Sequence, residues 1–132
     1  MIDNFNIRDY FGLEGRLGRK SFALRMLFGY AVSYALTFIT LSVVEKQGLS
    51  PLFVVLIILA FINLSFIYSN ILARLRDINR GRIWAIILFC LHHNMAQPPA
   101  SELFYLIHIL GIIFLICKKG SAGENKYGPP PQ

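Results

Sequence analysis

Two long apolar stretches, residues 21–44 and 51–73, constrain the fold of this chain more than any other feature. Each has the ~20 predominantly apolar residues that an α-helix needs to cross the ~30 Å hydrocarbon core of a bilayer. The linker between them, 45–50, is short, and Gly48 and Pro51 mark the end of one helix and the start of the next. Such a short linker predicts that the two helices form an antiparallel transmembrane hairpin.

The overall composition favours a membrane domain over a soluble one. Hydrophobic residues make up 55% of the 132 residues and charged residues only 15%, which is too apolar for an ordinary soluble domain. The N-terminal segment 1–20 has Asp9 and Glu14 where a cleavable signal peptide would have its apolar core. We therefore expect a single membrane domain over residues 1–132, inserted by helices that the chain retains.

The C-terminal half has two shorter apolar segments, residues 83–97 and 103–119, on either side of a Pro-Pro pair. As a helix, residues 83–97 would extend only ~22 Å, which is less than the bilayer core. Either this helix begins earlier, or the bilayer thins around it, or the two segments form a re-entrant hairpin. Ser101 before Glu102 predicts a helix start, because serine caps helix N-termini and acids are favourable in the first turn. We favour four spanning helices.

Basic residues lie almost entirely on one side of these spans. Of the thirteen Lys and Arg residues, only Lys46 falls in the linker between the first two spans. Because short loops rich in Lys and Arg stay in the cytoplasm, both termini are predicted to be cytoplasmic. The expected fold is therefore an all-α integral membrane protein: a four-helix transmembrane bundle of two antiparallel hairpins, the second short. In chain order, we predict an interfacial or cytoplasmic segment at 1–20, spans at 21–44, 51–73, 83–97 and 103–119, a cytoplasmic loop at 74–82 and a cytoplasmic tail at 120–132.

Polar and small residues within the first two spans form two rows at helical spacing. They are Gly29, Ser33 and Thr37 in the first, and Asn63, Asn70, Arg74 and Asp77 in the second. Small residues every four positions let helices approach closely, and the spacing of the second row places its members on one helix face. Polar groups at membrane depth are costly unless they face protein or water, so we expect both rows to point into the bundle. Helix–helix contact is the simpler interpretation, and a path for a substrate or ion is the alternative.

Residues 73–84 contain four arginines and a single acid, Asp77. Arg74 can reach Asp77 along a helix, because the two are three residues apart. Three further arginines are candidates to reach it from another helix: Arg16, Arg19 and Arg25. Since arginines favour the charged form of a carboxyl group, we expect Asp77 to be a structural hub rather than a general acid.

No combination of residues predicts a reaction. The sequence has no Ser/His/Asp set, Gly-rich phosphate loop or paired carboxylates at a recognisable spacing. His92 and His93 would point about 100° apart on a helix, and His108 with Glu102 lacks an HExxH-type spacing. We predict no catalytic residue, metal or cofactor. The formal charge of +6 is interpreted as setting orientation and meeting anionic lipid, not nucleic acid, because the basic residues flank apolar spans.

Three motifs lie in register with the apolar spans. They are GRLGRKSF at residues 15–22 after the aromatic pair at 10–11, ARLRDINRGRIW at 73–84, and GSAGENKYGP at 120–129. Together they resemble the opening, central and closing motifs of the DUF805 family of small bacterial inner-membrane proteins. The chain departs from the family pattern at Arg76, which replaces the usual His, and at Arg82, which displaces a Ser-Gly step. The resemblance implies a fold and a location but no activity, because the family's function is unknown.

The predicted function is a non-enzymatic module of the bacterial cytoplasmic (inner) membrane whose cytoplasmic cap binds anionic lipid headgroups or a partner protein. A second copy of the chain and another membrane protein are further candidate partners. The residues expected at the binding site are Arg16, Arg19, Arg74, Arg76, Asp77, Arg80, Arg82, Asn125, Lys126 and Tyr127, and the intramembrane polar residues are Arg25, Asn63 and Asn70.

Two other functions are open. An oligomeric transporter or channel component would use the polar row of the second span, and an enzyme on lipid-linked substrates would use Asp77 or the histidines. The tail residues Asn125, Lys126 and Tyr127 are expected to fold back over the arginines, with a disordered tail as the alternative.

Overall fold

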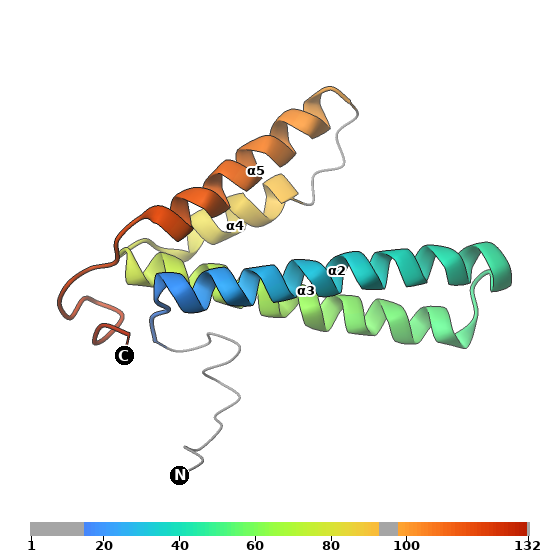
Figure 1. The fold of residues 1–132 in the computed structure, drawn as a ribbon, viewed down its shortest axis with the longest axis horizontal. Helices are drawn as coiled ribbons and strands as arrows, with labels where there is room; N and C mark the ends of the chain where they lie inside the picture. Colours follow the sequence, from blue (N-terminus) through green and yellow to red (C-terminus); the bar gives the residue numbers. More distant parts are fainter. Residues whose placement is uncertain (1–14, 93–97, 132) are drawn as a thin grey trace, which may run out of the picture.

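The computed structural model describes residues 15–92 and 98–131, and this part of the chain is all-helical (Figure 1). Its four helices are α2 (Arg19–Gln47), α3 (Pro51–Asp77), α4 (Arg82–His92) and α5 (Ala100–Cys117). Within the described residues there is no β-strand, only an isolated bridge between Asn125 and Gly128. The predicted all-α class is confirmed.

Three of the four helices are long and apolar enough to cross a membrane, namely α2, α3 and α5. The 29 residues of α2 and the 27 of α3 extend roughly 40 Å each, and the 18 of α5 about 27 Å. The 11 residues of α4 extend only about 16 Å, and residues 93–97, which the sequence placed in the same span, lie outside the described residues. The chain is therefore a membrane protein with three span-length helices and a shorter fourth.

The helix boundaries follow local sequence signals at one junction and depart from them at another. Between α2 and α3, Gly48 has φ 64° and ends α2, while the Ser50 hydroxyl accepts a hydrogen bond from the Phe53 amide (3.4 Å). The prediction from Gly48 and Pro51 is confirmed. Ser101 is not the N-cap of α5, because that helix begins at Ala100 directly after the Pro-Pro pair, which leaves Ser101 inside the first turn.

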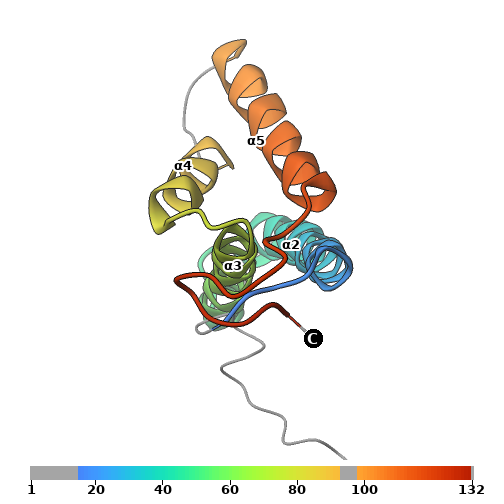
Figure 2. The same cartoon turned by 90° about the vertical axis from the view of Figure 1, so that its left-hand side faces the viewer.

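The helices are arranged as two pairs that converge at one end. α2 and α3 lie side by side, and α4 and α5 form a second pair that diverges from the first (Figures 1 and 2). The start of α2, the end of α3, the start of α4 and the end of α5 meet at the same end of the molecule. The polar groups at these four helix ends are therefore brought together.

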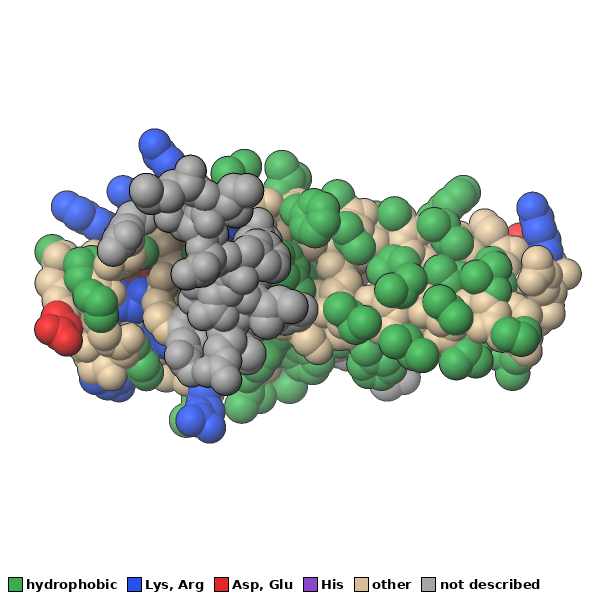
Figure 3. Space-filling model, turned by 90° about the horizontal axis from the view of Figure 1, so that it is seen from below, with side chains coloured by type: hydrophobic (Ala, Val, Ile, Leu, Met, Phe, Trp, Pro, Cys, Tyr) green, Lys and Arg blue, Asp and Glu red, His purple; other side chains and the backbone are tan. Residues whose placement is uncertain are grey.

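The apolar core lies next to this converging end, and the rest of the apolar surface faces outward. Gly29 allows α2 to approach α3 closely, since a Cβ there would lie 2.8 Å from Cγ1 of Ile67. Figure 3 shows hydrophobic side chains spread along the length of the molecule, as expected of a surface that contacts lipid. The buried core comprises Leu17, Phe22, Met26, Ile67, Ile71, Ala73, Leu75, Ala85, Leu88, Ile112 and Leu115.

Candidate functional site

Asp77 is the last residue of α3, which continues four residues beyond the predicted span boundary at Ala73. Arg74, Arg76 and Asp77 therefore lie on the helix rather than in a loop. The apolar pattern stops at Ala73, but the backbone continues as a helix because other parts of the chain supply partners for its last carbonyl groups.

The Asp77 carboxylate lies between two arginines from different segments. Arg16 donates from Nε and Nη2 to Oδ1, at 3.1 and 2.9 Å, and Arg74 donates from Nη1 to Oδ2. The side chains of Arg16 and Arg74 are 0% exposed and that of Asp77 is 4% exposed. We call Arg16, Arg74 and Asp77 the buried cluster.

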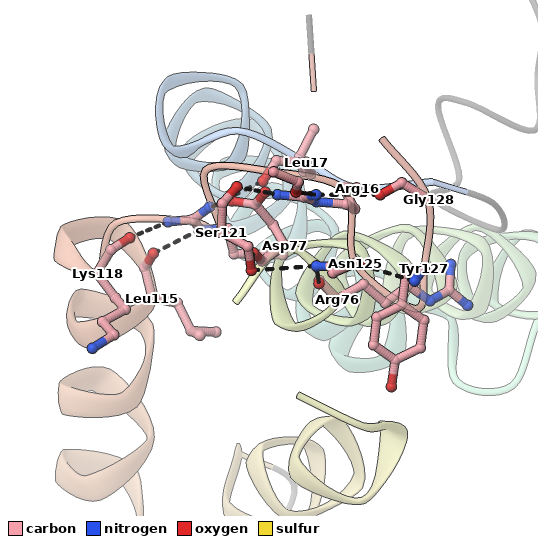
Figure 4. A network of polar contacts seen from close by, with 12 residues as sticks. Arg16, Leu17, Arg76, Asp77, Leu115, Lys118, Ser121, Asn125, Tyr127 and Gly128 are labelled. Atoms are coloured by element: carbon pink, nitrogen blue, oxygen red, sulfur yellow. Dashed lines mark hydrogen bonds and ion pairs between the residues drawn. The ribbon is translucent and has the colours of Figure 1, made fainter. Parts of the chain in front are cut away.

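The buried cluster contains two positive charges and one negative charge, so its excess positive charge needs further acceptors. Arg16 donates to three tail carbonyls: Ser121 (2.6 Å), Gly123 (2.7 Å) and Gly128 (3.2 Å) (Figure 4). The Arg16 guanidinium thus bonds to one carboxylate oxygen and three backbone carbonyls. The Arg74 guanidinium also bonds to one carboxylate oxygen and three backbone carbonyls.

Arg74 joins three segments through its backbone contacts. It donates to the carbonyls of Leu17 (3.2 Å), Leu115 (2.8 Å) and Lys118. Leu115 and Lys118 lie at the C-terminal end of α5, where unpaired carbonyls and the helix dipole favour a cation. The Arg74 side chain therefore caps α5 while it holds the segment before α2.

The tail, residues 118–131, caps α3 in return. Ser121 donates from its amide (2.8 Å) and its hydroxyl (3.0 Å) to the Asp77 carbonyl, and Asn125 Nδ2 donates to the Arg76 carbonyl (3.0 Å). Gly120 lies so close that a Cβ on it would overlap the Asp77 carboxylate. Figure 2 shows the tail crossing the ends of α2 and α3. The tail folds back over the arginines as expected, but Arg16 bonds to Ser121, Gly123 and Gly128, and of the three predicted residues Asn125 bonds to the Arg76 carbonyl.

The tail keeps its shape through a tight turn. Asn125 and Gly128 exchange backbone hydrogen bonds of 3.1 and 2.9 Å, and the Tyr127 amide donates to Oδ1 of Asn125 (2.9 Å). Gly128 has φ 108°, a conformation that favours glycine. Lys126 extends outward, with Nζ 5.0 Å from the centroid of the Tyr127 ring.

A second group of cations surrounds the buried cluster and is exposed. We call this group the cation shell: Arg19, Lys20, Arg80, Arg82, Lys118, Lys119 and Lys126. Figure 3 shows Lys and Arg side chains gathered around this end of the molecule. Four of the seven were among the predicted site residues, and the other three lie beside them at the same helix ends. Arg76, also predicted, is half-buried, and Arg19 does not join the buried cluster.

The predicted intramembrane polar residues connect α2 to α3. Asn63 Nδ2 donates to the Gly29 carbonyl (3.1 Å) and to Oγ of Ser33 (2.7 Å). Arg25 Nη1 donates to Oδ1 of Asn70 (3.2 Å), so Arg25 pairs with this amide rather than with Asp77. The two rows face each other here, as expected, although Thr37 at the end of the first row is exposed.

A cluster of tyrosines and histidines between α2, α4 and α5 was not predicted from the sequence. Nε2 of the buried His108 lies 2.7 Å from the Tyr30 hydroxyl, and Nδ1 lies 2.9 Å from the Leu88 carbonyl. The His92 ring lies 4.6 Å from the His108 ring, and Tyr105 is adjacent to both. In residues 15–92 and 98–131, no three His, Cys, Asp or Glu side chains are grouped to hold a metal ion; His93 lies outside this range.

A family model described as "Protein of unknown function (DUF805)" matches residues 10–129, which include all four helices, the buried cluster and the turn of the tail. No curated protein and no solved structure matches the chain.

Proposed function

We propose a function for this chain on the premise that it belongs to the DUF805 family of proteins of unknown function. The protein is a non-enzymatic module of the bacterial inner membrane. In this proposal, the end where the four helices converge lies in the cytoplasm and binds the headgroups of anionic lipids. The buried cluster holds that end together, and the cation shell contacts the lipids.

The proposed topology is a four-helix bundle of two antiparallel hairpins, α2–α3 and the shorter α4–α5, with both termini cytoplasmic. The distribution of exposed charge supports it: among the described residues, the opposite helix ends have Glu45, Lys46 and Glu102, and thus more acids than bases. In a cysteine-free background, Lys46→Cys should react with a membrane-impermeant maleimide on intact spheroplasts, and Glu124→Cys only after lysis. The reverse labelling would refute the topology.

One observation carries the lipid-binding proposal, namely the excess of exposed positive charge where the helices leave the membrane. Seven exposed cations form the shell, and among the described residues of this end only one exposed acid, Glu124, opposes them. Each Lys or Arg near an anionic membrane surface contributes about 1 kcal/mol of attraction. The arginines of the shell can also form paired hydrogen bonds with a phosphate group.

The buried residues support this division of roles. Arg16 and Arg74 direct their donors to Asp77 and to backbone carbonyls, and their side chains are 0% exposed. A lipid phosphate would have to displace these internal contacts to reach them. We therefore assign the buried cluster to holding the tail and helix ends, which fixes the backbone that carries the shell.

Anionic lipid is favoured over a protein partner because the shell lies at helix ends, at the depth where lipid headgroups begin. Transport through the polar row of α3 is less well supported, since Asn63 and Asn70 bond to residues of α2. Enzymatic activity has no support from the buried cluster, in which Asp77 already accepts from two arginines.

The test compares the lipids retained by two variants. Arg80→Gln, Arg82→Gln, Lys118→Gln and Lys119→Gln are combined in one variant, and Lys46→Gln at the opposite end serves as the control. Each protein is purified from vesicles of phosphatidylethanolamine and phosphatidylglycerol, and the retained lipids are quantified. The unmodified protein and the control should be enriched in phosphatidylglycerol, and the shell variant should approach the bulk ratio. Equal enrichment in all three would refute lipid binding by the shell.

A further inference from the structure

A pocket opens between α2 and α5 on the face that would contact lipid, away from the cation shell. Its volume is about 250 Å³, and its lining includes Tyr30, Tyr34, Tyr105, His108, Ile109 and Ile113. The proposed lipid binding at the cytoplasmic end does not use this pocket. Histidine is rare at membrane depth, and a buried histidine there is by default a candidate for a functional site.

The inner end of the pocket is a fixed hydrogen-bonded unit. Because the Leu88 carbonyl can only accept, Nδ1 of His108 carries the proton that it donates (2.9 Å). In the neutral ring, Nε2 then accepts from the Tyr30 hydroxyl (2.7 Å). This unit connects α4, α5 and α2, and it holds the His108 ring in place as one wall of the pocket.

The outer end of the pocket offers a hydrogen-bond donor. The hydroxyl groups of Tyr34 and Tyr105 lie 3.3 Å apart, and either can be the donor of that bond. Two hydroxyls have two hydrogens, and their mutual bond uses one, so the other remains available to an acceptor outside the pair. A hydroxyl hydrogen in a hydrocarbon environment is costly to leave without an acceptor.

The walls of the pocket suit a flat ring. The rings of Tyr105 and His108 are nearly parallel, with an interplanar angle of 24° and centroids 6.4 Å apart. Isoleucine side chains complete the lining. Since a cavity of about 150 Å³ can hold benzene, the observed volume is sufficient for one substituted six-membered ring.

The depth of the pocket in the membrane indicates which kind of molecule can reach its inner end. Tyr30 is eleven residues after Arg19 in α2 (30 − 19), or about 16 Å along the helix. His108 is nine residues before the end of α5 at Cys117 (117 − 108), or about 14 Å. Both lie near the middle of a ~30 Å hydrocarbon core, so the inner end of the pocket is out of reach of phospholipid headgroups. The outer end is shallower, since Tyr105 is five residues after the start of α5 at Ala100 (105 − 100), or about 8 Å along the helix.

We infer that this pocket binds a lipid-soluble molecule with a planar ring and a carbonyl oxygen, the chemistry of a quinone head group. The carbonyl accepts the hydrogen from the Tyr34–Tyr105 pair, and the ring packs against Tyr105, His108 and the isoleucines. An acyl chain fits the apolar wall but has no acceptor for this donor.

The experiment uses the full-length protein in lipid nanodiscs and a photoreactive azido derivative of decyl-ubiquinone. Labelling should be saturable, should be displaced by unlabelled decyl-ubiquinone and should map to peptides of α2 and α5. Tyr34→Phe with Tyr105→Phe keeps both rings and removes the donor, so apparent affinity should fall about 3- to 10-fold. Ile113→Phe should fill the pocket and abolish saturable labelling.

Tyr68→Phe is the matched control. Tyr68 lies on α3 beside Phe89, with ring centroids 5.8 Å apart, and lines a different groove. Its loss of a hydroxyl should leave labelling unchanged. Labelling that excess decyl-ubiquinone does not displace, or an equal loss in Tyr68→Phe and the double variant, would overturn the inference. Neither result depends on lipid binding by the cation shell.

Discussion

The Asp77 carboxylate accepts hydrogen bonds from the two buried guanidinium groups of Arg16 and Arg74, which come from segments far apart in the sequence. One short side chain thus fixes three parts of the chain, because each arginine also bonds to the backbone of the tail or of α5. The prediction of Asp77 as a structural hub is supported by these contacts. Its partner Arg16 was one of three arginines considered, and only position in the fold distinguishes it from Arg19 and Arg25.

Asp77→Asn should destabilise the protein strongly. The substitution removes the negative charge and leaves two buried guanidinium groups facing a neutral amide, which costs about 3–5 kcal/mol. Unfolding in mixed detergent and denaturing micelles measures this free energy. Glu124→Gln, on an exposed acid of the tail, is the control and should have almost no effect. Equal stability of Asp77→Asn and the unmodified protein would show that the buried cluster contributes little.

Gly120→Ala should loosen the tail. A Cβ at this position overlaps the Asp77 carboxylate, whereas a Cβ at Gly123 meets nothing within 4 Å. Because overlap of this kind costs about 1–3 kcal/mol, hydrogen exchange at the Ser121 amide should accelerate by roughly tenfold or more. Gly123→Ala should leave it unchanged. Slow exchange at Ser121 in both variants would contradict the observed packing of the tail.

At the scale of whole helices, the sequence predicts well those features that depend on residues close together in the chain. The apolar lengths of α2 and α3 and the junction between them follow from local patterns, and the structure agrees with them. The helical spacing of Arg74 and Asp77 was recognised, but the end of the span was placed at Ala73 because the partners of the last carbonyl groups, Ser121 and Asn125, lie more than forty residues later. The Tyr30–His108 bond was missed for the same reason, since it joins residues 78 positions apart.

The contact between α2 and α3 should depend on Asn63. Asn63→Ala removes donors to the Gly29 carbonyl and the Ser33 hydroxyl, and hydrogen bonds of this kind contribute about 0.5–2 kcal/mol within membranes. Unfolding in micelles should show a loss of that size. Ser65→Ala is the control, because the exposed Ser65 hydroxyl donates only to the Phe61 carbonyl of its own helix (2.9 Å). A loss in Ser65→Ala as large as in Asn63→Ala would contradict this role.

At the scale of the whole molecule, the charged residues at the converging helix ends form two groups, the buried cluster and the cation shell. The buried cluster has its donors and acceptors satisfied internally, and the cation shell is exposed around it. The sequence predicted that positive charge is concentrated at this end. It did not predict which cations are buried and which are exposed, because Arg16 and Arg19 belong to the same motif and differ only in burial. Gly120 in the closing motif was the available signal that the tail packs closely, since only there does a Cβ overlap the Asp77 carboxylate.

The most direct test of the proposed function is a measurement of contact between lipid phosphorus and side-chain nitrogen. Solid-state NMR of the protein in phosphatidylglycerol-containing bilayers reports such contacts as phosphorus–nitrogen dipolar couplings. We predict couplings at Arg80, Arg82, Lys118 and Lys119 of the cation shell, and none at Lys46 or at the buried Arg74. Couplings as strong at Lys46 as in the shell, or none in the shell, would contradict the account.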